Sequence, residues 1–408
     1  MRALGASRTS LVPGGVLAGP WVRDDLWRRA RAVPSLDLRF ADNKSLTDAV
    51  TGASLVTFTR ASSGTYTDSA GVIQTAATDV PRFDHNPTTG ESLGLLVEEA
   101  RTNLLLRSEA IATSPWFANA NTTLSNNTGE VLDPAGGSTA TKVAVSGGFG
   151  AFGQGAVLTA AIHTGSIWLR CATGTISAQL IVYLAESPFT NIGTTNVTIT
   201  TSWQRFNVVT STATAASYNF QINNIAVGTV YAWGAQLEVG SFPTSYIPTT
   251  TAAVTRSADV ASITGSAFTS FYNQTEGSFF CSTFAPKGTV VYGTGDTFDN
   301  TQYINAALSY NVIIRSGGAG SATLTAPVST ATVANIAHGY AANNFAAVSN
   351  GGTIDTDTSG AVPLAQVRLK LGSSAWDTGG NNNINGHIRR LTFWGQRLPN
   401  NILQGITQ

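Results

Sequence analysis

Charged residues are scarce in this sequence. Asp, Glu, Lys and Arg together make up 11% of the 408 residues, against about 25% in an average soluble domain. The 23 basic and 23 acidic residues also cancel, so the formal net charge is zero. Such a chain creates no field of one sign that would gather nucleic acid or an anionic membrane. We therefore expect neither nucleic acid nor a membrane among its partners.

Cysteines and long apolar runs are scarce too. The two cysteines, Cys171 and Cys281, are too few for a disulfide framework and are not spaced as a metal site. We interpret them as small buried hydrophobic residues. No segment offers the roughly 20 consecutive apolar residues that span a bilayer. The mildly apolar stretch Leu11–Ala18 is interrupted by Pro13–Gly15, which makes it a poor signal peptide.

Residues that favour strands and turns are abundant instead. The chain has 41 glycines and eight tryptophans, and it is rich in Ser, Thr and Asn throughout. β-branched and aromatic residues favour strands, while Gly and Asn favour tight turns. This composition predicts an all-β fold. Because one sandwich needs roughly 100–200 residues, we expect tandem jelly-roll or β-sandwich modules with an extended N-terminal arm.

The arm is residues 1–34, and it is rich in arginine. Its segment Asp24–Ala32 predicts a short helix, with aspartate near the start and arginine near the end, as the helix dipole favours. A helix this short is not stable alone, so it needs a partner surface, either another copy of the chain or a socket on a particle. We expect anchoring through Trp21, Arg23, Trp27, Arg28 and Arg29.

Three β regions follow the arm. Residues 35–105 begin with the alternating segment Leu36–Phe40 and predict a small β connector. Residues 106–261 contain strand patterns such as Gln179–Leu184, separated by turn signals at the spacing of a sandwich. Residues 262–408 predict a second sandwich, with a strand before the Asn350-Gly351 turn. A helical turn is expected at the C-terminus, from Pro399 to Gln408.

Several strings in these regions are recognisable. Leu93–Leu105, together with the upstream segments 58–66 and 81–85, resembles a motif of phage and prophage fibre or head-spike proteins. Residues 231–249 look like the end of the carbohydrate-binding-module-like jelly roll of such proteins. Gly386–Leu391 is similar to the closing strand of their concanavalin- or laminin-G-like domains. The resemblance covers about residues 35–408.

The resemblance implies a structural protein of a bacteriophage virion, located on the particle surface as a tail or head appendage. The arm would bind other virion proteins, and the sandwich modules would attach to a host-surface glycan or receptor. A homotrimer is implied for a fibre. Two alternatives remain open: a purely structural decoration or adaptor protein without a ligand, and a glycan-cleaving tailspike.

Acidic residues that could serve catalysis are poorly arranged for it. Glu98 and Glu99 are neighbours on a predicted strand and point to opposite faces, so they do not flank one glycosidic bond as a two-carboxylate mechanism requires. Asp84 and His85 lack a nucleophile in a defined setting, and we interpret them as part of a turn. We therefore predict no catalytic residues and no enzyme activity.

Metal ligands are not grouped either. Asp355–Gly360 matches the first half of a calcium loop, but its twelfth position is Gln366 instead of a bidentate Glu. We interpret this segment as a polar strand and turn. The histidines His163, His338 and His387 stand apart from other metal-type residues. We expect neither a metal nor a cofactor.

Tryptophans are the remaining candidates for ligand contact, because an aromatic face matches the apolar face of a sugar ring. Trp168, Trp233 and Trp394 lie in apolar strand patterns, which favours the core. Trp116 follows a proline, and Trp376 lies in a Gly/Ser/Asn-rich loop, so these two are expected to be exposed. We predict Trp116 and Trp376 as glycan-binding residues.

Overall fold

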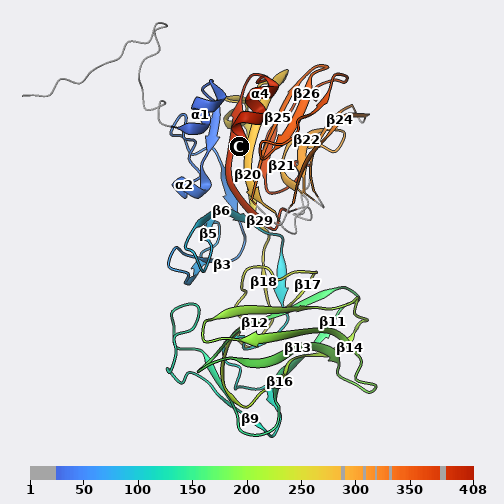
Figure 1. Cartoon of the computed structure of the whole chain (residues 1–408). Helices are drawn as coiled ribbons and strands as arrows, with labels where there is room; N and C mark the ends of the chain where they lie inside the picture. Colours follow the sequence, from blue (N-terminus) through green and yellow to red (C-terminus); the bar gives the residue numbers. More distant parts are fainter. Residues whose placement is uncertain (1–23, 286–289, 307–308, 318, 330–332, 377–382) are drawn as a thin grey trace, which may run out of the picture.

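The computed structural model describes residues 24–285, 290–306, 309–317, 319–329, 333–376 and 383–408. It confirms the all-β fold class, with antiparallel sheets and a few short helices. The sheets form two modules, a jelly roll and a sandwich whose strands come from before and after the jelly roll in the sequence, joined by a narrow neck (Figure 1).

The jelly roll consists of two five-stranded sheets, with the orders β15-β12-β17-β10-β9 and β14-β13-β16-β11-β8. Alternate residues of each strand enter the core between them, as Leu180 and Val182 of β13 do opposite Ile222 and Phe220 of β16. The strands are β8 (Phe117–Ala118), β9 (Thr122–Ser125), β10 (Thr141–Val145), β11 (Gly150–Leu158), β12 (His163–Cys171), β13 (Ile176–Leu184), β14 (Asn191–Ile199), β15 (Gln204–Val209), β16 (Ala216–Ile225) and β17 (Gly228–Val239).

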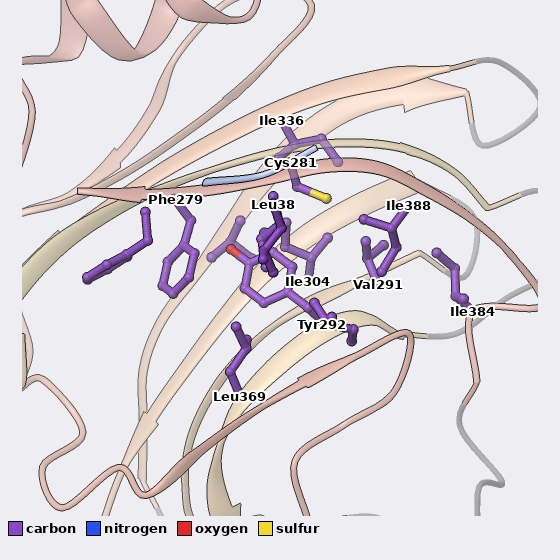
Figure 2. Packing of buried hydrophobic residues seen from close by; sticks show 14 of the residues in the cluster. Leu38, Phe279, Cys281, Val291, Tyr292, Ile304, Ile336, Leu369, Ile384 and Ile388 are labelled. Atoms are coloured by element: carbon purple, nitrogen blue, oxygen red, sulfur yellow. The ribbon is translucent and has the colours of Figure 1, made fainter. Parts of the chain in front are cut away.

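The second module packs an eight-stranded sheet on a seven-stranded sheet. The first has the order β27-β26-β25-β20-β29-β6-β5, with β1 paired to β29, and the second has the order β2-β19-β28-β21-β22-β23-β24. Figure 2 shows their shared core, in which Phe279, Cys281 and Tyr292 pack together. The strands are β1 (Leu36–Leu38), β2 (Thr57–Thr59), β5 (Arg82–His85), β6 (Ser92–Val97), β19 (Val260–Thr264), β20 (Glu276–Phe284), β21 (Val290–Thr297), β22 (Asn300–Asn305), β23 (Ser309–Ser316), β24 (Ala319–Ser329), β25 (Ala334–Ala341), β26 (Phe345–Ser349), β27 (Asp355–Asp357), β28 (Arg368–Leu371) and β29 (Gly386–Trp394).

The expected connector of residues 35–105 is not a separate unit. Its strands β1, β5 and β6 extend the sheet of β29, and β2 pairs with β19. The alternating residues Leu36, Leu38 and Phe40 are fully buried in the core of the second module, which explains the pairing. Strands β3 (Gly64–Thr67) and β4 (Ile73–Ala76) pair only with each other and form a separate two-stranded sheet. The jelly roll is therefore inserted into the second module.

The chain enters and leaves the jelly roll through one two-stranded ribbon. Strand β7 (Arg101–Asn103) pairs with β18 (Val254–Arg256), which lies 150 residues later, so that Asn103 opposes Val254. The amide of Asn103 donates to the carbonyl oxygens of Ala235 and Ile247, at 3.0 and 2.9 Å. This ribbon is the neck of Figure 1.

A buried cluster of charges lies beside the neck, and we call it the junction cluster: Arg60, Arg82, Glu98, Arg256 and Asp259. Asp259 accepts from Arg60 at 3.1 Å and also binds Arg82. Glu98 lies 2.8 Å from Arg82 and 3.5 Å from Arg256. Burial alone would raise the pKa of Glu98, but the charges of Arg256 and Arg82 outweigh it and hold that pKa well below its usual range. The cluster thus holds its charges by mutual pairing.

Short helices lie at the ends of the described chain. The predicted helix is confirmed as α1 (Asp25–Ala30), with the Asp24 side chain capping Trp27 N at 3.1 Å. A partner surface for this short helix lies within the same chain, where α1 packs on α4 (Asn400–Ile406). The expected C-terminal helical turn is this α4. The other helices are α2 (Phe40–Asn43) and α3 (Gly265–Thr269).

Replacing Asp259 by Asn tests the junction cluster. The variant leaves Arg60 and Arg82 without their shared carboxylate in a buried site, which costs about 3–5 kcal/mol of unfolding free energy. Urea unfolding measures the loss. The control is Glu91→Gln, which breaks the 2.7 Å pair with Arg389 where the Glu91 side chain is 59% exposed, and it costs less than about 1 kcal/mol. Equal, small losses in the two variants would contradict the structure.

Candidate functional site

One sheet of the jelly roll carries no charged side chain. Its strands β8, β11, β13, β14 and β16 contain no Asp, Glu, Lys or Arg. The other sheet of the same module does, with Lys142, Arg170, Arg205 and Glu238. The outer face of the uncharged sheet therefore exposes amides and hydroxyls, with apolar side chains such as Val157 beside them, and it offers hydrogen bonds without ionic attraction.

The polar residues of this face form cross-strand pairs. Gln179 on β13 lies opposite Asn196 on β14, and its Nε2 donates to Asn196 Oδ1 at 2.9 Å. Ser177 lies opposite Thr198 in the next outward position. Between them, the inward-facing Ala178 belongs to the core. The alternation of strand residues thus sets the polar groups on one face and the apolar ones on the other.

A groove of about 440 Å³ runs over these pairs. We call it the amide groove, and its lining is Phe149, Ser177, Ala178, Gln179, Asn196, Val197, Thr198 and Asn224. Phe149 precedes β11 and is 62% exposed, so its ring is available to a ligand. Asn224 has a φ of 50°, a left-handed conformation that asparagine tolerates better than most residues. The groove combines one aromatic side chain with amide donors and acceptors.

Trp116, one of the two predicted glycan-binding residues, lies in the core. It is 7% exposed and packs against Phe152 with ring centroids 6.2 Å apart. Its indole N–H donates to the carbonyl oxygens of Leu106 and Arg107 at 3.0 and 3.2 Å. Because these bonds satisfy the polar atom, the ring is buried, and the expected exposure of Trp116 is wrong.

Trp376, the second predicted residue, is half-buried in an aromatic group of the other module. Its ring meets Tyr303 and Phe298 edge to face, at centroid distances of 5.0 and 5.4 Å. Arg315 lies over the Phe298 ring at 4.0 Å. The structure does not bring Trp376 near Trp116 or the amide groove, and its role in glycan contact stays a prediction. Trp233 and Trp394 are buried as expected, whereas Trp168 is half-buried.

The five predicted anchoring residues differ in their surroundings. Trp21 and Arg23 lie outside the described residues. Trp27 is buried and donates to Asp37 Oδ2 at 2.9 Å, and Arg29 donates to the carbonyl oxygen of Gly405 at 2.8 Å. Both are therefore engaged within the chain. The Arg28 side chain is 70% exposed beside Asp25.

The acidic candidates are held in structural contacts. Glu98 belongs to the junction cluster, and Glu99 pairs with Arg101. Asp84 lies on β5 rather than in the expected turn, and its Oδ2 is 2.8 Å from Nε2 of His387. The following residue, His85, is 3.0 Å from the carbonyl oxygen of Thr67.

The candidate calcium loop and the two cysteines lie where the sequence interpretation put them. Asp355–Asp357 form β27 before a turn capped by the carboxylate of Asp357, as we interpreted them. Cys171 and Cys281 are free and buried, again as expected. Within the described ranges, no group of three His, Cys, Asp or Glu residues is placed to hold a metal ion. No helix among those ranges has the length and apolar character needed to cross a membrane.

The sequence predictions missed the amide groove. Its signal was present: polar residues alternate with apolar ones at 176–180 and 196–199, without a single charge. Which two segments pair, and in which register, is not visible in the sequence. The exposed Phe149 depends on a loop conformation that alternation does not predict.

Comparisons with known proteins find similarity at the level of single modules. No family model matches the chain, and no curated protein matches it. The NanB sialidase from Streptococcus pneumoniae is 15% identical with a TM-score of 0.30, and the match covers 35% of this chain and 26% of the sialidase. The chain thus spans about a quarter of that enzyme.

Two smaller structures match in the same way. The CBM40 module of the Ruminococcus gnavus IT-sialidase is 17% identical, with a TM-score of 0.29, over 33% of this chain and 83% of the module. The CBM22-1 xylan-binding domain of Paenibacillus barcinonensis Xyn10C is 9% identical, with a TM-score of 0.29, over 36% of this chain and 99% of the domain. These matches cover about a third of the chain, so the ligand has to be inferred from the site itself.

Truncating Trp116 separates a core role from a ligand role. Trp116→Ala removes a buried ring and its two hydrogen bonds, and it lowers the unfolding free energy by about 3–5 kcal/mol. Phe149→Ala is the matched control on an exposed ring and changes it by about 0.5 kcal/mol or less. Thermal and urea unfolding of both variants measure this. A stable Trp116→Ala variant would contradict the buried position.

Proposed function

We propose that this chain is a glycan-binding structural protein of a bacteriophage particle and that its ligand binds in the amide groove. The observation that carries the proposal is a 440 Å³ groove on a sheet without any charged residue. Sugars present hydroxyls that both donate and accept, and amide side chains match them in both roles. The ligand class is therefore an uncharged oligosaccharide.

The geometry of the groove supports an extended ligand. Its lining crosses neighbouring strands, with three residues from β13, three from β14, one from β16 and Phe149 just before β11. The exposed ring of Phe149 offers an apolar face against which one sugar ring packs. The remaining units contact Gln179, Asn196 and Thr198.

Binding without cleavage is the mode we propose. Hydrolysis of a glycosidic bond needs two carboxyl groups on opposite sides of the bond. The lining of the amide groove contains no acidic residue. The surface-exposed groove holds its ligand for attachment, while the carboxylates of Glu98, Glu99 and Asp84 serve pairing within the chain.

The virion role rests on the resemblance of residues 35–408 to phage fibre and head-spike proteins. In this proposal the N-terminal arm binds other virion proteins, and the copies assemble as a homotrimer. Since α1 packs on α4, we propose that anchoring falls to residues before Asp24, including Trp21 and Arg23, and to the exposed Arg28.

Substituting Gln179 tests the ligand site. Gln179→Ala removes one hydrogen-bonding amide and weakens binding about five- to tenfold. A glycan array first selects a neutral oligosaccharide, and calorimetry then compares the variants. Gln221→Ala is the matched control, an outward amide of β16 that is not in the groove lining. Because no ionic contact contributes, added salt leaves the affinity unchanged. Equal affinities of the two variants would overturn this site.

Locating the chain in intact particles by cryo-electron microscopy tests the virion role. The proposal expects it at the outer end of a tail or head appendage, as a trimer with the jelly rolls facing outward. Density on the flat capsid shell, or buried at a joint within the tail, would favour the decoration or adaptor alternative. The purified full chain provides the reference for fitting.

A further inference from the structure

A second hollow lies between the two modules. This junction cleft has a volume of about 240 Å³. Its lining comes from segments far apart in the sequence and includes Tyr66, Asp84, Trp168, Arg205, Pro243 and Phe284. It is separate from the amide groove, with which it shares no residue.

The two modules contribute opposite walls of the cleft. Residues 65–73 of the β3–β4 hairpin, Asp84 of β5 and His387 of β29 belong to the second module and its extension. Trp168, Arg205 and residues 243–246 belong to the jelly roll and its exit segment. A hydrogen bond joins the two walls: the backbone N–H of Ser245 donates to the carboxylate of Glu98 at 2.8 Å.

The wall of the second module offers hydrogen-bond acceptors and hydroxyls. Asp84 Oδ1 accepts from Thr67 N at 2.6 Å, and Oδ2 lies 2.8 Å from His387 Nε2. A carboxylate has about four lone-pair sites, so Asp84 keeps acceptor capacity. Among the described residues, the hydroxyl of Tyr66 makes no hydrogen bond within the chain. The carboxylate of Asp84 and the hydroxyl of Tyr66 can therefore accept hydrogen bonds from a ligand on this wall.

The wall of the jelly roll offers donors and an aromatic surface. The Arg205 guanidinium lies over the Trp168 ring at 4.4 Å and donates to Thr244 O at 2.6 Å and to Ser166 Oγ at 3.0 Å. A guanidinium has five N–H donors, so some remain for a ligand acceptor. Its Nε–H has no partner in the part of the chain that the structure describes.

The apolar part of the lining completes the match to a sugar. Trp168, Phe284 and Pro243 present carbon surface between the polar groups. Pockets for drug-sized ligands are roughly 300–1,000 Å³, so a cleft of about 240 Å³ suits a smaller ligand, such as one pyranose ring. One wall offers hydrogen-bond acceptors, the other offers donors, and apolar surface lies between them. This arrangement fits a pyranose ring, which has hydroxyl groups around its edge and C–H groups on its faces.

We propose that the junction cleft binds a single uncharged pyranose unit between the modules, with Asp84 and Tyr66 on one side and Arg205 on the other. The inference rests on the proposed function for the ligand class, but it assigns a second site that binds independently of the amide groove. A ligand that touches both walls also stabilises the relative position of the two modules, since it binds the assembled junction alone.

Saturation-transfer NMR on the full chain tests the cleft with a panel of monosaccharides: glucose, galactose, N-acetylglucosamine and rhamnose. At least one is expected to bind at millimolar affinity. Tyr66→Phe weakens that binding about three- to tenfold, and Asp84→Asn weakens it about tenfold or more. Tyr183→Phe and Glu91→Gln are the matched controls, because neither residue lines the cleft, and they leave binding unchanged.

The outcomes separate this inference from the proposed function. Loss of monosaccharide binding in Tyr66→Phe and Asp84→Asn, with binding retained in Gln179→Ala, supports the cleft. Loss in Gln179→Ala with binding retained in the two cleft variants overturns the cleft and leaves the groove standing. A wild-type chain that binds none of the four sugars also overturns it, while oligosaccharide binding by the groove is measured separately. Because the Tyr66 hydroxyl has no partner within the described chain, Tyr66→Phe is expected to fold normally, and its unfolding midpoint checks this.

Discussion

The junction cluster is the interaction on which the arrangement of the molecule depends. Glu98 and Asp259 stand where the chain leaves the second module for the jelly roll and where it returns, and Arg60, Arg82 and Arg256 join them. Buried ion pairs add little net stability over apolar packing, but a lost partner is costly. We infer that the cluster specifies geometry: it holds both ends of the inserted module in one place, and Glu98 extends this to Ser245 in the wall of the junction cleft.

Charge is distributed unevenly between the parts of the molecule. A chain with 11% charged residues places five of them in the junction cluster and none in one whole sheet of the jelly roll. The same scarcity of charge that led us to expect no nucleic-acid partner also produces a surface suited to uncharged polar ligands. In the proposed binding mode, hydrogen bonds and aromatic contact supply the affinity there, so specificity depends on the positions of amides and hydroxyls and not on a long-range field.

Local patterns predicted the elements, but not their partners. The dipole pattern of residues 24–32 correctly indicated a short helix, because helices reflect neighbouring residues. The alternation in Leu36–Phe40 indicated a strand, which the structure ends at Leu38, while Phe40 begins α2. The pairing of β1 with β29, more than 350 residues away, depends on non-local packing, and it turned the expected connector into part of a sandwich. Trp116 was misjudged for a related reason: its burial depends on two carbonyl oxygens of residues 106 and 107 that no pattern reveals.

The central claim is that the uncharged sheet is the ligand surface, and a crystal structure of the full chain with a neutral oligosaccharide selected on a glycan array tests it most directly. The account predicts density for the sugar along the amide groove, with one ring packed on Phe149 and hydroxyls within hydrogen-bond distance of Gln179 and Asn196. Well-defined sugar density elsewhere on the molecule, with the amide groove filled by solvent, would contradict it.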